Sequence, residues 1–174
     1  ANDYVQIGGA NIIVAVACYS GNNEEDSLII SGDTGHKGKY VAAYSNHDTV
    51  EFDRNETLEN PQDYTTTMGI KYYADYTKLK DGCTPEGTLV HKGVVVASRR
   101  RKLNKQAVRE SGGATHVDQS VIYNYEYPAR VHRVVKTRDE DGKFICKIGY
   151  QSFKPVKEGD KWSSRHGQKG VCAM

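Results

Sequence analysis

Runs of apolar residues separated by turn-forming residues predict a protein built mainly from strands. Residues 11–19 form a continuous β-branched and small apolar run, which is typical of a strand buried on both faces. The run ends at the turn signal Ser20-Gly21-Asn22-Asn23, and the apolar pattern resumes at residues 28–30. The pattern therefore predicts that residues 24–26, Glu-Glu-Asp, lie on a connection between two buried strands.

The later part of the chain predicts a hairpin. Residues 129–137 have strand composition, and residues 143–153 alternate so that Phe144, Cys146, Ile148 and Tyr150 share one face. Between them, residues 139–142 read Asp-Glu-Asp-Gly, and the glycine can adopt the positive φ that such a turn requires. The second strand leads directly into a basic, glycine-rich segment.

The middle of the chain is less regular. Further strands are expected at residues 40–44, 94–96 and 119–127. The segment from Arg99 to Gly113 begins with Arg-Arg-Arg-Lys, and a polar run of this kind predicts a solvated, mobile loop. The alternative is a basic loop near nucleic acid that binds backbone phosphate without reading sequence.

Composition and charge narrow the class of protein. The 174 residues suffice for one domain, but only 37% are hydrophobic, so a partner surface is expected to complete the core. The formal net charge of +2 says little about nucleic acid. Four widely spaced cysteines without a Cys-x-x-Cys pair predict free thiols and no structural zinc. With neither a secretory leader nor a long apolar run, we expect an intracellular protein outside the membrane, and nucleus, cytoplasm and virion remain open.

The last seventeen residues gather three glycines, two lysines, one arginine and one histidine. Glycines let the backbone approach a ligand, while lysine and arginine supply charge that matches phosphate oxygens. The segment therefore indicates a loop that handles phosphates, and a solvated glycine-rich tail is the alternative.

Two motifs in the same order resemble the second-largest catalytic subunit of multisubunit DNA-dependent RNA polymerases, the bacterial β-subunit family. One is Gly159-Asp160-Lys161 followed by Ser164-Arg165-His166-Gly167-Gln168-Lys169-Gly170. The other is the apolar run from Ala15, then Gly21 and Glu25-Asp26-Ser27-Leu28-Ile29-Ile30. The residues of these motifs are closer to those of the archaeal, eukaryotic and large-DNA-virus branch than to those of the bacterial branch. Because the likeness covers only a minor central part of a family subunit, we interpret the chain as a fragment or as one piece of a split subunit.

The resemblance implies a mainly β fold with a partial double-psi β-barrel, the hybrid-binding domain, and an inserted wall-like or flap-like β-rich region. Residues 1–50 would form the first part of the barrel with the acidic motif. Residues 51–142 would form the insertion. Residues 143–174 would form the second part of the barrel with the basic loop.

The resemblance also implies site residues. In the family the principal catalytic Mg²⁺ is held by three aspartates of the largest subunit, and a Glu-Asp pair of the second-largest subunit lies near the second magnesium, which arrives with the nucleotide. Carried over, Glu25 and Asp26 become auxiliary metal ligands acting through water. Adjacent residues on a strand point to opposite faces, so both can address one ion only if the backbone bends there.

Five basic residues in or shortly before the signature are implied to lie near nucleic acid. Lys154 and Lys161 match lysines that contact the transcript backbone close to its growing end, and with Glu25 and Asp26 they form the expected catalytic set. Arg165, His166 and Lys169 lie near the same site without an assigned role. His166 is either a proton donor or a structural hydrogen-bonding residue.

The function implied is a central piece of a DNA-directed RNA polymerase, a nucleotidyltransferase active only in a multisubunit complex. Its partners would be the largest subunit and other polymerase subunits, together with template DNA, RNA transcript and nucleoside triphosphates. Two alternatives stay open: a non-catalytic module that binds RNA–DNA hybrids, and an unrelated metal-dependent nuclease using Glu25 and Asp26. We further expect the carboxylates and lysines to converge in space, although more than a hundred residues separate them in sequence.

Overall fold

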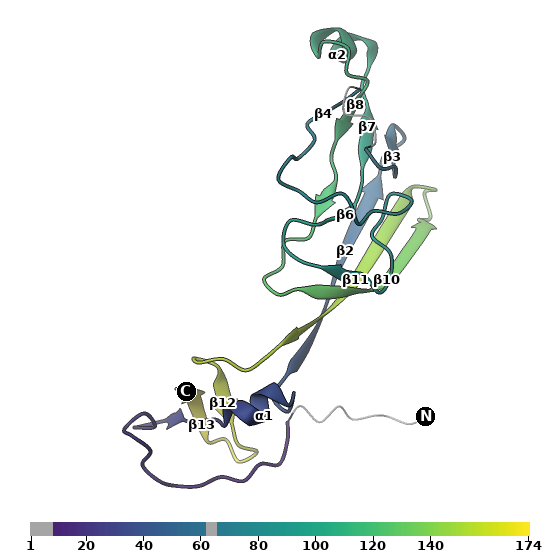
Figure 1. Cartoon of the computed structure of the whole chain (residues 1–174). Coiled ribbons are helices and arrows are strands. Elements are labelled where there is room, and N and C mark those ends of the chain that lie inside the picture. The colour runs from purple at the N-terminus through teal and green to yellow at the C-terminus, as the bar shows by residue number, and fades with distance from the viewer. Residues whose placement is uncertain (1–8, 62–65) are drawn as a thin grey trace. The chain divides into compact units, whose positions relative to one another are not determined.

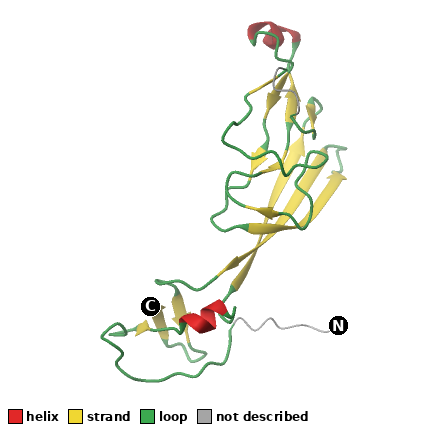
Figure 2. Ribbon diagram, in the orientation of Figure 1, coloured by secondary structure: helices red, strands yellow, loops and turns green. Residues whose placement is uncertain are grey.

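The prediction of a mainly β protein is confirmed. A computed structural model describes residues 9–61 and 66–174, in which thirteen strands and two short helices occur (Figures 1 and 2). The chain divides into two compact units, residues 1–42 with 154–174 and residues 43–153. The expected division at residues 50 and 142 and the double-psi topology remain predictions.

The first unit contains a three-stranded sheet made from both ends of the sequence. Strand β1 (Ser27–Leu28) pairs in parallel with β13 (Lys169–Cys172), which pairs antiparallel with β12 (Lys161–Ser163). The short helix α1 (Gly32–His36) follows β1. The central strand β13 therefore brings the basic segment beside the residues that follow the acidic motif.

The prediction of a buried strand at residues 11–19 is wrong. The segment is irregular and exposed throughout, and the side chains of Ile13 and Val16 are 103% and 101% exposed. A strand buried on both faces needs neighbouring strands that share its backbone hydrogen bonds and cover its side chains, and within residues 9–61 and 66–174 no strand pairs with this run. Apolar composition indicated the tendency to be buried, but not the surface that would do it.

The second unit is organised by a four-stranded sheet in the order β2-β11-β10-β5. Its members are β2 (Ala42–Phe52), β11 (Phe144–Lys154), β10 (Ala129–Arg138) and β5 (Leu89–Val90). The predicted hairpin is confirmed, because β10 and β11 pair antiparallel and Asp139 N–H donates to Lys143 O at 2.9 Å. Gly142 has a φ of 77°, as the turn requires.

The hydrophobic core lies on the inner face of this sheet. The expected alternation on β11 is confirmed: Cys146, Ile148 and Tyr150 are buried, while Phe144 is half-buried and packs against them. Strand β6 (Val95–Ala97), paired with β9 (Val121–Ile122), adds its fully buried residues to the same interior. The strand expected at 94–96 is thus present one residue later, whereas that expected at 119–127 shrinks to β9.

The basic segment at residues 99–113 differs from the predicted solvated loop. Part of it forms strand β7 (Arg100–Lys102), which lies between two other strands in a second sheet of order β3-β7-β8-β4. Its neighbours are β3 (Glu56–Thr57), β8 (His116–Asp118) and, beyond β8, β4 (Thr67–Met68). Helix α2 (Lys105–Glu110) follows, with the Asn104 side chain accepting a hydrogen bond from Ala107 N–H at 2.8 Å.

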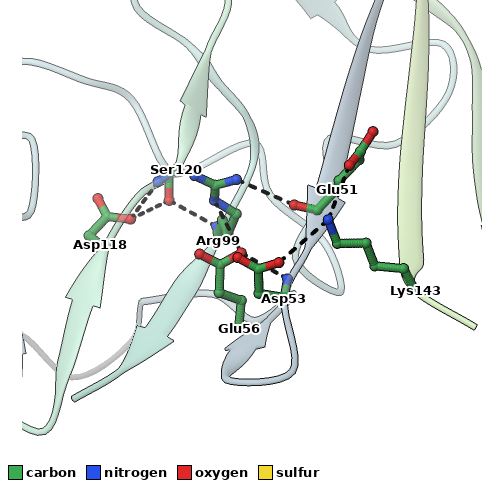
Figure 3. Close-up of polar contacts among 7 residues, drawn as sticks. All are labelled: Glu51, Asp53, Glu56, Arg99, Asp118, Ser120 and Lys143. Carbon is green, nitrogen blue, oxygen red and sulfur yellow. Dashed lines mark hydrogen bonds and ion pairs between the residues drawn. The ribbon is translucent and has the colours of Figure 1, made fainter. Parts of the chain in front are cut away.

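Counter-ions from distant sequence explain why this basic run is ordered. Figure 3 shows Arg99 between the Glu56 carboxylate, 3.8 Å from its Nε, and the Glu51 carbonyl oxygen, 3.3 Å from its Nη1. Arg100 pairs with Glu59 at 3.2 Å. Two arginines of the run therefore form ion pairs within the protein, which the sequence of the run alone does not reveal.

Candidate nucleic-acid interface

The acidic motif forms a tight turn immediately before β1. Ser27 N–H donates to Glu24 O at 3.2 Å, and Glu25 has a φ of 55°, in the left-handed region that non-glycine residues rarely adopt. Glu25 and Asp26 are exposed. This bend is the kind of turn that allows two adjacent carboxylates to address one ion, instead of pointing to opposite faces of a strand.

The three-stranded sheet carries Lys161 close to this turn. Ser27 and Lys161 are both register partners of Val171, on opposite sides of it. The acidic turn is also tied directly to β13, because Val171 N–H donates to Asp26 O at 3.0 Å. Neighbouring strands lie about 4.8 Å apart, so the backbones of Ser27 and Lys161 are about 10 Å apart.

Lys154 reaches the same sheet through an ion pair. Its Nζ lies 2.8 Å from Asp160 Oδ1, and Asp160 Oδ2 accepts a hydrogen bond from Lys157 N–H at 3.0 Å. The hydrogen bond from Lys154, followed by that from the Lys157 backbone, lowers the pKa of Asp160 below its usual value. Asp160 O also accepts from Cys172 N–H at 2.8 Å, which anchors this pair beside β13.

The remaining signature residues lie on the hairpin between β12 and β13. The Ser164 hydroxyl oxygen accepts from the N–H groups of His166 and Gln168 at 3.2 and 3.3 Å, and Gly167 has a φ of 84°. Arg165, His166 and Lys169 are exposed. The hairpin backbone is therefore held by its own hydrogen bonds, while the side chains of these three residues face solvent.

Several of these cations are available to a ligand. Within residues 9–61 and 66–174, Lys161, Arg165 and Lys169 form no ion pair with a carboxylate. Lys154 differs, since Asp160 already balances its charge. An incoming phosphate would therefore meet three unbalanced cations and one that it must share.

The acidic turn offers two exposed carboxylates as candidate metal ligands. Among the described residues, no group of three or more His, Cys, Asp or Glu side chains is placed to hold a metal ion. Mg²⁺ commonly binds one or two carboxylates and completes its shell with water and substrate phosphates. Glu25 and Asp26 fit that incomplete donor set.

Sequence reasoning missed two participants. Asp160 was quoted within the signature but given no role, although an acidic residue six positions after Lys154 was a visible signal for a pair across the intervening turn. Gly170 was also given no role beyond its place in the signature. It lies against the backbone of Asp26, and these two residues are too distant in sequence for any local pattern to show the contact.

Fold and surface together define a β-rich domain in which an acidic turn precedes the first strand of a small three-stranded sheet and basic side chains follow its other two strands. The chain belongs to the family described as RNA polymerase Rpb2, domain 6, whose profile matches residues 3–174. The resemblance to second-largest polymerase subunits is thereby confirmed.

Curated relatives come from cells and from a virus. The chain is 33% identical over 172 residues to DNA-directed RNA polymerase II subunit 2 of Arabidopsis thaliana, covering 95% of this chain and 14% of the relative. It is 32% identical over 174 residues to DNA-directed RNA polymerase subunit 2 of Acanthamoeba polyphaga mimivirus, covering 94% and 14%. It is also 29% identical to DNA-directed RNA polymerase III subunit rpc2 of Dictyostelium discoideum, covering 99% and 11%. The chain thus corresponds to a small part of each relative.

Proposed function

We propose that this chain forms part of the active centre of a DNA-directed RNA polymerase, where it acts on the growing end of the transcript. The observation that carries the proposal is the three-stranded sheet, which holds the Glu25-Asp26 turn and Lys161 two strands apart in a chain of the polymerase family. Nucleotide addition needs cations at the reacting phosphates and a grip on the phosphates already joined. This sheet offers groups for both.

The carboxylates serve as auxiliary ligands. Glu25 and Asp26 would hold, through water, the magnesium that arrives with the nucleoside triphosphate, and this ion would supply positive charge at the reacting phosphates. The principal Mg²⁺ ligands would belong to the largest subunit. Support comes from the exposed bend at Glu25, where the backbone departs from the extended form that would direct adjacent side chains to opposite faces.

The lysines hold the transcript backbone. Lys161 acts as a point charge on a flexible stem, which suits a strand that must advance after each addition. Lys154 acts from its pair with Asp160, and Arg165 and Lys169 extend the cationic surface along the hairpin, where His166 lies beside them as a hydrogen-bonding group. The partners of this function are the other polymerase subunits, template DNA, RNA and nucleoside triphosphates, within the cell or virion. Among the described residues, no helix has the length and apolar character needed to cross a membrane.

Single-turnover extension by the assembled polymerase tests the proposal. Asp26→Ala should slow addition of one nucleotide and leave retention of the RNA–DNA hybrid nearly unchanged, because the lost group acts on the metal that the nucleotide brings. Asp33→Ala removes another exposed carboxylate of the same unit and should match the wild type. Equal rates for Asp26→Ala and the wild type would remove this residue from the site and leave only hybrid binding to the chain.

A further inference from the structure

Gly170 lies where β13 passes closest to the acidic turn. A Cβ atom at this position would overlap the carbonyl oxygen of Asp26, and it would stand 3.1 and 3.3 Å from Cγ and Cδ1 of Leu28. Gly170 does not have a positive φ, so its backbone conformation does not itself call for glycine. The requirement comes from the close approach of the two segments.

The atoms in this contact cannot move aside as a flexible side chain would. Asp26 O belongs to the backbone, and it accepts the hydrogen bond from Val171 N–H, the residue directly after Gly170. The turn that carries Asp26 is closed by the bond from Ser27 N–H to Glu24 O. A methyl group at Gly170 must therefore displace a connected piece of backbone.

The acidic turn is the side that would yield. On the other side of β13, β12 is held through three register pairs, one of which joins Gly170 to Trp162, whose indole packs edge-on against Tyr40 at 4.9 Å between ring centroids. β1 is held through two register pairs and by the bonds from Ala173 N–H to Leu28 O and from Ile30 N–H to Met174 O, both at 2.9 Å, and all of these lie after the acidic turn in sequence. The end of the ladder at Asp26 is therefore expected to open, and Asp26 would move away from Lys161.

We propose that Gly170 is a positioning residue that sets the place of the Asp26 carboxylate by allowing the acidic turn to seat directly on β13. This inference rests on the proposed function, since it assigns Gly170 a role through Asp26. Misplacing a catalytic group by about 1 Å can cost on the order of a hundredfold in rate. Gly170 touches neither metal nor RNA in this role; it acts only through the turn.

The test uses Gly170→Ala in the assembled polymerase. Single-turnover nucleotide addition should fall by about ten- to a hundredfold at fixed Mg²⁺, and the Mg²⁺ concentration that gives half the maximal rate should rise. Transcript retention and its salt dependence should stay at the wild-type values, because the lysines are untouched. Gly32→Ala is the matched control: its Cβ would meet nothing within 4 Å and its φ is not positive, so it should behave as the wild type.

A combined variant separates positioning from general damage. If Gly170 acts through the acidic turn, adding Gly170→Ala to a chain that already carries Glu25→Ala and Asp26→Ala should cause no further loss of rate. Multiplying effects would overturn the inference, as would a wild-type rate or Mg²⁺ requirement for Gly170→Ala. Failure of Gly170→Ala to assemble would also overturn it, because the glycine would then serve the fold. If Asp26→Ala itself is as fast as the wild type, the proposed function of the turn fails instead.

Discussion

Replacing Lys161 with alanine should weaken transcript retention equally for every RNA sequence. The side chain is exposed on β12, and no carboxylate among the described residues pairs with it. Its charge is therefore free to neutralise a phosphate, and a phosphate contact releases counter-ions without reading bases.

The size of the effect follows from counter-ion release. Each phosphate neutralised adds about 0.7 to 0.9 to the slope of log affinity against log salt, so Lys161→Ala should lower the slope by about that amount. Between 50 and 200 mM salt, losing one contact should reduce the salt-induced drop in affinity by about threefold. Lys154→Ala should change the slope less, because Asp160, at 2.8 Å, already balances that charge.

Competition release of labelled RNA from halted complexes across that salt range provides the assay. Lys161→Arg keeps the positive charge and should keep the slope of log affinity against log salt. This variant therefore separates the loss of charge from the loss of the long side chain. An unchanged slope for Lys161→Ala, or a loss of retention that depends on RNA sequence, would refute the assignment of this lysine to the transcript backbone.

Three further predictions concern stability and accessibility of the chain. Gly82→Ala should lower the free energy of unfolding by about 2–4 kcal/mol in urea titration, because its φ is 80° and a Cβ would lie 2.8 Å from Leu58 O. Gly87 has a φ of 82° and open space around its Cβ position, so Gly87→Ala should lower the free energy of unfolding by only about 1–2 kcal/mol. Burial, helped by the hydrogen bond to Asp48, raises the pKa of Tyr125 from 10.0 to about 12. The folded state therefore holds the Tyr125 hydroxyl proton more tightly than the unfolded state. The resulting stability should be fully present below pH 10.0 and lost as pH rises toward about 12. The urea concentration at the midpoint of unfolding should fall between these two pH values, and it should fall less in Tyr125→Phe. Iodoacetamide should label the exposed Cys18 first and reach the buried Cys83, Cys146 and Cys172 only after unfolding, whereas equal labelling of all four in the native state would contradict the described packing.

Regular alternation allowed the sequence to predict part of the fold. The hairpin of β10 and β11 was found because apolar residues recur at every second position and an Asp-Gly turn separates the strands. Residues 11–19 misled the same reasoning, because an apolar run indicates a tendency toward burial without identifying a partner. Strand β7 was missed for the opposite reason: it is basic, and the acidic residues that balance it lie more than forty positions earlier.

The candidate site also has a part that the sequence predicted and a part that it did not. Residue types and order pointed to the acidic pair and the basic hairpin, since these are local features of sequence. The pairing of Lys154 with Asp160 and the seating of the Asp26 turn against Gly170 depend on how β1, β12 and β13 meet in space. Such contacts follow from sheet topology, which no local pattern encodes.

The central claim is that the acidic turn and the basic strand act on the same end of the transcript, and cross-linking tests it most directly. RNA carrying a photoreactive 4-thiouridine at its growing end would be halted in the assembled polymerase and irradiated, and the cross-linked peptides would be identified by mass spectrometry. We expect the cross-links within this chain to fall in residues 24–30 and 159–172. Cross-links confined to residues 43–153, with none on either of those segments, would contradict it.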